Sequence, residues 1–140
     1  MCYAIDAPRR RRYLVPITEG KSVPSPPQVV VETRPYLAKA EKLLEESEAK
    51  EIVDIVATNP LVGDLIRGTG GVRKFRFALG ARGKSGGARV IYFFHDEDMP
   101  IYLLTIFPKN QKVSLTKAEK NQLRALTEQL VRTYKEAHDE

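Results

Sequence analysis

Two strand patterns separated by a glycine-rich segment constrain the fold of this chain more than any other feature. In Val72–Leu79 (VRKFRFAL), apolar residues alternate with the cations Lys74 and Arg76. Side chains of a strand point alternately to its two faces, so this pattern places both cations on one face. A second strand pattern, Arg89–His95, follows the segment 80–87 (GARGKSGG). The sequence therefore predicts a β-hairpin whose connection is rich in conformationally permissive glycine.

Positive charge is concentrated in and around this hairpin. Residues 63–89 contain seven lysines and arginines against one aspartate, a net charge of +6, whereas the whole chain carries only +5. Such a concentration beside glycine-rich turns, where backbone N–H groups are accessible, predicts a polyanionic ligand. If the two strands pair, four of the cations converge at one end of a sheet: Lys74, Arg76, Lys84 and Arg89. Solvated surface charge would explain any one of these cations, but it explains a cluster of four poorly.

Two nucleotide-binding motifs are excluded by spacing. Gly83-Lys84-Ser85 resembles the end of a phosphate-binding P-loop, but the position of its first glycine is Ala78. The segment also leads into a strand instead of a helix. A dinucleotide-binding fingerprint starting at Gly68 would need a third glycine where Arg73 stands.

Composition excludes several further classes of protein. With Cys2 as the single cysteine, neither an internal disulfide nor a cysteine metal cluster can form. The only histidines are His95 and His138, so we expect no metal and no cofactor. No apolar run approaches the roughly 20 residues of a membrane span, and no secretory signal is recognisable, so we expect a cytoplasmic protein without a membrane partner.

The first 28 residues differ from the rest of the chain. They contain four consecutive arginines and five prolines with little hydrophobic periodicity. We interpret residues 1–28 as a disordered, basic and proline-rich extension, and residues 29–140 as one folded domain. An upstream start codon or an added expression sequence would explain such an extension. A nucleic-acid-binding arm is the alternative.

The remaining elements predict an α+β fold. Val29–Glu32 reads as a short strand, and Thr33 as the N-cap of a first helix. A second helix is expected from about Glu48 to Asn59. Its apolar positions and those of the first helix indicate one buried side each. The two carry an excess of acids, which a solvated helix face explains.

The hairpin is followed by another strand and a final helix. Ile101–Phe107 is almost continuously apolar, as in the centre of a sheet, and Thr116-x-x-Glu119 is a capping box that opens the last helix. Leu123, Leu126, Leu130 and Tyr134 form the inner face of that helix. We therefore expect an antiparallel sheet packed by two N-terminal helices and a C-terminal helix, arranged as one layer on the sheet.

Three blocks of sequence together resemble one protein family. NPLVGDLIRGTGGVRKFRF, GKSGGARVIYFF and LLTIFPKNQKVSLTKAEKNQL are similar, in order and spacing, to the RelE superfamily. The similarity is to its HigB-like toxins of bacterial type II toxin–antitoxin modules, and it extends over about residues 29–130. The resemblance implies a RelE-like fold and a ribosome-dependent endonuclease that cuts mRNA. It also implies a small cognate antitoxin, usually a helix-turn-helix protein, so that DNA is contacted only through the antitoxin.

The resemblance also implies site residues. The basic positions of the family's second strand correspond to Arg73, Lys74 and Arg76. Its loop lysine corresponds to Lys84, its strand-opening arginine to Arg89, and the cation after its last strand to Lys109. In this family the ribose 2′-OH attacks the adjacent phosphate without a metal. The C-terminal tyrosine of some relatives has no counterpart here, because Tyr134 fits the inner face of a helix.

Elementary chemistry agrees with these roles. An RNA phosphodiester attacked by its own 2′-OH needs orientation, proton transfer and stabilisation of a doubly charged phosphorane, and clustered cations supply the last. Arg89 suits a bidentate grip on phosphoryl oxygens, and Lys84 or Lys74 could serve as general base or acid. We therefore expect a catalytic set of Arg89, Lys84, Lys74 and Arg76, and an RNA- or ribosome-binding set of Arg73, Arg82, Lys109 and Lys112.

Two other functions use the same residues. A decayed toxin would keep the fold and the charge as a non-catalytic RNA- or ribosome-binding module. A protein-binding domain would use the basic face only to dock an acidic partner. We favour the endonuclease because the cations from Arg73 to Arg89, together with Lys109, are all present.

Overall fold

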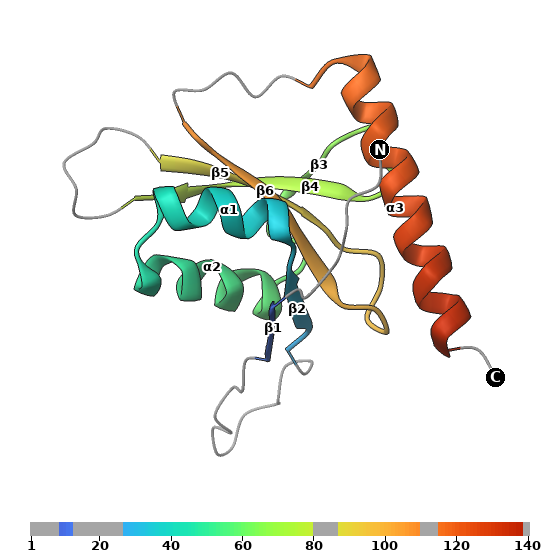
Figure 1. The fold of residues 1–140 in the computed structure, drawn as a ribbon, viewed down its shortest axis with the longest axis horizontal. Coiled ribbons are helices and arrows are strands. Elements are labelled where there is room, and N and C mark those ends of the chain that lie inside the picture. The colour runs from blue at the N-terminus through green and yellow to red at the C-terminus, as the bar shows by residue number, and fades with distance from the viewer. Residues whose placement is uncertain (1–8, 13–26, 80–86, 110–114, 139–140) are drawn as a thin grey trace.

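The computed structural model describes residues 9–12, 27–79, 87–109 and 115–138. Its strands are β1 (Arg9–Arg12), β2 (Val29–Glu32), β3 (Asp64–Leu65), β4 (Val72–Ala78), β5 (Gly87–Phe93) and β6 (Ile101–Pro108). They form one sheet in the order β1-β2-β6-β5-β4-β3 (Figure 1). Neighbouring strands are antiparallel except for β2 and β6, which are parallel. The α+β class and the mostly antiparallel sheet are as predicted.

The three helices lie on both faces of this sheet. α1 (Arg34–Leu43) and α2 (Glu46–Thr58) pack on one face, and α3 (Lys117–His138) packs on the other (Figure 1). Two separate clusters of buried side chains reflect this arrangement, one under α1 and α2 and one under α3. The expectation of a single helical layer is therefore wrong. Most residues of β5 and β6 are buried on both faces of the sheet, so both faces must be covered.

The helix starts follow local sequence signals. The Thr33 hydroxyl accepts a hydrogen bond from the backbone N–H of Tyr36 at 3.4 Å and caps α1. At α3 the predicted capping box is present, with Thr116 N–H donating to the Glu119 carboxylate at 2.8 Å and Glu119 N–H donating to the Thr116 hydroxyl at 3.1 Å. A second capping box, around Glu45, starts α2 two residues before the predicted position. The predictions for Thr33 and for the Thr116–Glu119 pair are confirmed because capping depends on residues close in sequence.

The helices bury the expected faces with one addition. Leu126 and Leu130 of α3 are buried as predicted, and the buried side of α2 consists of Ile52, Val53, Val56 and Ala57. The largest buried side chain of α1 is Tyr36, which the sequence pattern did not identify. None of the described helices is long and apolar enough to cross a membrane.

The N-terminal segment contributes a strand that its sequence pattern did not predict. Arg9–Arg12 pair antiparallel with β2, from Arg9 opposite Glu32 to Arg12 opposite Val29. The Gln28 side chain also donates to the backbone carbonyls of Asp96 and Met99 at 3.2 and 3.1 Å. The other residues of the expected extension, apart from 27 and 28, lie outside the described ranges. The domain boundary at residue 29 stays a prediction.

Candidate functional site

The predicted hairpin exists, and its register brings two arginines face to face. β4 and β5 pair antiparallel from Val72 opposite Phe93 to Ala78 opposite Gly87, which sets Arg76 directly across from Arg89. Residues directly opposite on antiparallel strands point to the same face, with Cβ atoms about 5 Å apart. Lys74 lies two residues from Arg76 along β4 and therefore shares that face.

Arg89 differs from the other cations of the hairpin in its burial and hydrogen bonding. Its backbone neighbours Ala88 and Val90 are fully buried, and its own side chain is partly buried. Among the described residues, its Nε is buried and has no hydrogen-bond partner. A buried donor on a permanent cation costs free energy unless an acceptor reaches it. An anionic oxygen would satisfy that donor and the charge together.

The hairpin face that contains Arg89 is apolar at one end and polar at the other. Val72, Ile91 and Phe93 pack with α3 residues in one buried cluster at the far end of the hairpin from the glycine-rich connection. Toward the connection the polar side chains begin, with Lys74 half-buried and Arg76 exposed. Lys74 and Arg76 therefore lie toward the glycine-rich end of the hairpin, where the Arg76 side chain is open to solvent.

Arg73 lies on the opposite face and has a structural partner. Its guanidinium Nη1 donates to the carbonyl of Gly63 at 2.7 Å. The fully buried Tyr92, its register partner, donates to the Pro60 carbonyl at 2.7 Å and accepts from Gly63 N–H at 2.9 Å. Burial raises the pKa of Tyr92 above its ordinary value, while the Gly63 hydrogen bond and the Arg73 charge act in the opposite direction. Arg73 and Tyr92 together hold the segment between α2 and β4.

The remaining predicted residues are only partly placed. Lys109 is exposed directly after β6, and its backbone N–H donates to the Gly87 carbonyl at 2.8 Å, two residues from Arg89. The backbone of Lys109 is therefore near the arginine pair, and its role in binding stays a prediction. Lys84, Arg82 and Lys112 lie outside the described residues, and their roles stay predictions.

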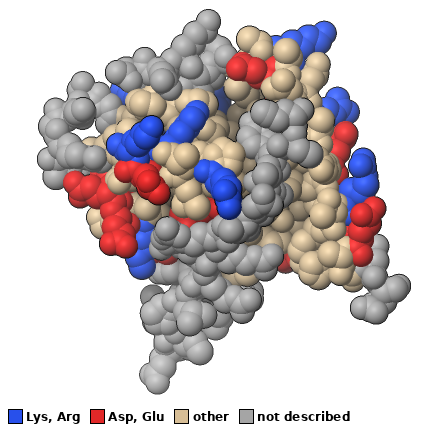
Figure 2. Space-filling model, in the orientation of Figure 1, with Lys and Arg blue, Asp and Glu red and all other residues tan. Residues whose placement is uncertain are grey.

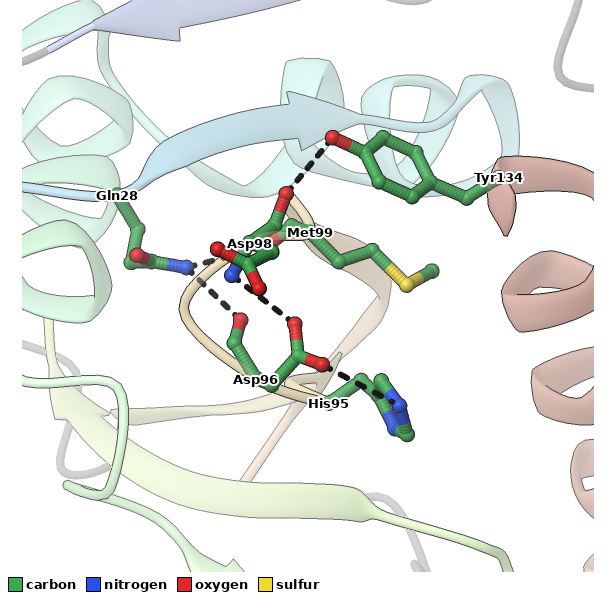
Figure 3. A network of polar contacts seen from close by, with 6 residues as sticks. All are labelled: Gln28, His95, Asp96, Asp98, Met99 and Tyr134. Atoms are coloured by element: carbon green, nitrogen blue, oxygen red, sulfur yellow. Dashed lines mark hydrogen bonds and ion pairs between the residues drawn. The ribbon is translucent and has the colours of Figure 1, made fainter. Parts of the chain in front are cut away.

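Both histidines lie away from the arginine pair. Figure 3 shows His95 in the turn after β5, 3.5 Å from the Asp96 carboxylate. In the same network, the Tyr134 hydroxyl of α3 donates to the Asp98 carbonyl at 2.7 Å. His138 stacks on Tyr134 with ring centroids 3.9 Å apart. This turn is a structural junction of β2, β6 and α3, and Tyr134 belongs to it.

The β4–β5 hairpin thus presents a cationic surface. Among the described residues, no histidine lies beside it. Arg76 and Arg89 lie opposite each other on one face of the hairpin, and Lys74 lies on the same face two residues along β4. Fixed cations stabilise a phosphoryl group whose charge increases during reaction.

Comparison with protein families identifies the family of this chain. A model described as "RelE toxin of RelE / RelB toxin-antitoxin system" matches residues 34–139, which is well over half of the chain. This chain belongs to the RelE toxin family. The family implies a cognate antitoxin as partner. In this RelE-family chain, the match begins at the first residue of α1, so β1 and β2 precede the matched range.

Proposed function

We propose that this RelE-family chain is a HigB-like toxin that cuts mRNA on the ribosome. The observation that supports this proposal most strongly is the arginine pair, Arg76 opposite Arg89, in which the buried Nε of Arg89 has no described partner. A cation held at a sheet surface with an unsatisfied donor is suited to an anionic oxygen. Family membership supplies the class of reaction.

The proposed reaction needs no external nucleophile. The 2′-oxygen of the ribose attacks the adjacent phosphorus, the bond from phosphorus to the 5′-oxygen breaks, and a 2′,3′-cyclic phosphate and a 5′-OH are formed. One group removes the 2′-OH proton and another protonates the departing 5′-oxygen. Arg89 and Arg76 would bind the non-bridging oxygens, where charge accumulates. Lys74 or Lys84 would transfer a proton.

The proposed partners follow from the same site. Arg73, Arg82, Lys109 and Lys112 would contact the ribosome or the mRNA, although the hydrogen bond from Arg73 to Gly63 favours a structural contribution from this residue. A helix-turn-helix antitoxin would neutralise the toxin. Covering the cations of the hairpin with an acidic or helical segment is the simplest way to do so.

A test of this function uses purified protein and translating ribosomes. RNA 5′ ends are mapped after brief exposure to the parent and to Arg89→Ala, with and without ribosomes. We expect cuts that require translation, 5′-OH ends that ligate only after phosphorylation, and almost no cutting by Arg89→Ala. Stable ribosome binding without cutting would favour the non-catalytic module. Binding to neither ribosome nor mRNA would favour the protein-binding alternative. Co-expression with the neighbouring reading frame tests the antitoxin.

A further inference from the structure

Helix α1 places a further cation, Lys39, beside the strand positions that align with the arginine pair. Phe107 of β6 is the register partner of Arg89, so Arg76, Arg89 and Phe107 lie side by side across three strands. The Nζ of Lys39, on α1, lies over the Phe107 ring, 4.3 Å from its centroid. The row therefore continues from the sheet to a helix, and its last member is a positive charge.

The position of Lys39 does not follow from the packing of its helix. α1 is anchored by Tyr36 and Ala40, which are buried in the cluster shared with α2. Lys39 is exposed and contacts Phe107, which packs with the cluster on the opposite face of the sheet. Lys39 thus crosses the side of β6 to reach the face on which Arg89 lies.

The charges near Lys39 favour an anionic ligand. α1 contains three cations and one acid, namely Arg34, Lys39, Lys42 and Glu41. Within the part of the chain that the structure describes, no ion pair involves Lys39. Figure 2 shows Lys and Arg side chains on the face that includes α1 and α2, with Asp and Glu side chains beside some of them.

We propose that Lys39 binds the RNA phosphate next to the one held by Arg76 and Arg89, with Phe107 as the residue that positions Lys39. This inference rests on the proposed function and adds α1 to the RNA-binding surface. Neighbouring strands are about 4.8 Å apart, so the row from Arg76 to Phe107 spans roughly 10 Å before Lys39 extends it. That length suits more than one phosphate of a single strand. The aromatic ring holds the ammonium group in place without neutralising it.

The test separates binding from cleavage. The probe is a short single-stranded RNA with every 2′-OH methylated, which the proposed reaction cannot cut. Its dissociation constant is measured between 50 and 200 mM salt for the parent, Lys39→Met, Phe107→Leu and the double variant. The matched control is Lys135→Met, which removes one exposed lysine from the last turn of α3. Thermal melts accompany each measurement.

We expect Lys39→Met to weaken binding by about three- to tenfold at low salt, and to lower the salt dependence by about 0.7 in the log–log slope, as for one lost phosphate contact. Phe107→Leu should cause part of this loss. In the double variant, the loss should equal that of Lys39→Met alone, because the ring acts through the lysine. Lys135→Met should change binding by less than twofold.

Three results would overturn the inference. The first is an equal loss of probe binding in Lys39→Met and Lys135→Met. The second is a lower melting temperature in Lys39→Met with unchanged binding. The third is no binding of the probe by the parent at low salt. The proposed function fails on a different observation, namely a parent that binds the probe through Lys39 but does not cut mRNA on ribosomes.

Discussion

The two ends of the β4–β5 hairpin use the same kind of side chain in opposite ways. At the end where β4 begins, Arg73 donates to the Gly63 carbonyl, and the neighbouring Tyr92 has both of its hydrogen bonds satisfied by Pro60 and Gly63. Near the glycine-rich connection, Arg89 has a buried Nε without a described partner. One arginine completes the fold, and the other is left with an unsatisfied donor.

Close backbone approaches reinforce the contrast. A Cβ on Gly63 would lie 2.8 Å from the Lys74 carbonyl oxygen, and Gly71 has a φ of +125° with the Phe93 ring 2.9 Å from the position of its missing Cβ. α3 joins this end through the Thr127 hydroxyl, which donates to the Thr69 carbonyl at 3.0 Å. Local saturation of hydrogen bonds, more than residue type, therefore separates structural arginines from those available to a ligand.

The largest expected effect is a loss of activity on substitution of Arg89, near the glycine-rich connection. Arg89→Ala should lower mRNA cleavage on translating ribosomes by ~10²–10³-fold, as for loss of one preorganised donor. Its melting temperature should hardly change, because no described partner is lost. Arg89→Lys should rescue poorly, because a point charge cannot replace a planar fork. The control is Arg67→Ala, an exposed arginine outside the pair. Cleavage by Arg89→Ala at the parent rate would remove Arg89 from the site.

The next largest effect is a loss of stability at the end of the hairpin where β4 begins and where the hydrogen bonds of Tyr92 are satisfied. Tyr92→Phe keeps the buried ring but leaves Gly63 N–H and the Pro60 carbonyl without the hydroxyl. The free energy of unfolding should fall by about 1–3 kcal/mol, measured by denaturant titration. Cleavage by the folded fraction should stay near the parent level. A large loss of cleavage at full stability would contradict the division between the two ends.

The same tyrosine predicts a pH dependence. Because burial raises the pKa of Tyr92, the folded state holds its proton at a pH where the unfolded chain, with a pKa near 10.0, has lost it. This contribution to stability is complete below pH 10 and is lost as the pH rises through the raised value. The parent should therefore lose more stability above about pH 10 than Tyr92→Phe does. Parallel melts across that range check it, and identical profiles would contradict it.

A matched pair of arginines tests the comparison directly. Arg73→Met should lower the free energy of unfolding by about 1 kcal/mol, because a partly buried charged donor loses its carbonyl acceptor, with little change in cleavage. Arg76→Met, on the exposed strand face, should do the reverse: near-parent stability and slower cleavage. Denaturant titrations and ribosome cleavage assays are run on both. If Arg73→Met slows cleavage as much as Arg76→Met, then Arg73 also contacts RNA or the ribosome.

The smallest effect concerns the segment before β2. Gln28→Ala removes two side-chain hydrogen bonds to the turn after β5, one of them exposed and one partly buried, so we expect a loss of stability of about 1 kcal/mol or less. Cleavage should not change. Gln28→Glu is the sharper control, because it keeps the size and removes the amide donor. A thermal melt equal to that of the parent would show that the turn does not need this contact.

Local patterns in the sequence determined much of this protein. The alternation around Lys74 and Arg76 predicted the hairpin and their shared face, because strand geometry has a period of two residues. Thr33 and the Thr116–Glu119 pair predicted two helix starts, because caps involve residues three apart. The glycine-rich segment was also recognised from sequence, although the placement of Lys84 within it stays a prediction.

Only the tertiary structure decided how these pieces combine. An amphipathic helix shows that it has a buried side, but not which face of the sheet it will cover, so the position of α3 was predicted wrongly. The hydrogen bond from Arg73 to Gly63 depends on a segment ten residues away that folds back beside β4. The contact of Lys39 with Phe107 joins residues far apart in the chain. Such contacts follow from packing of the whole sheet, which no local period in the sequence encodes.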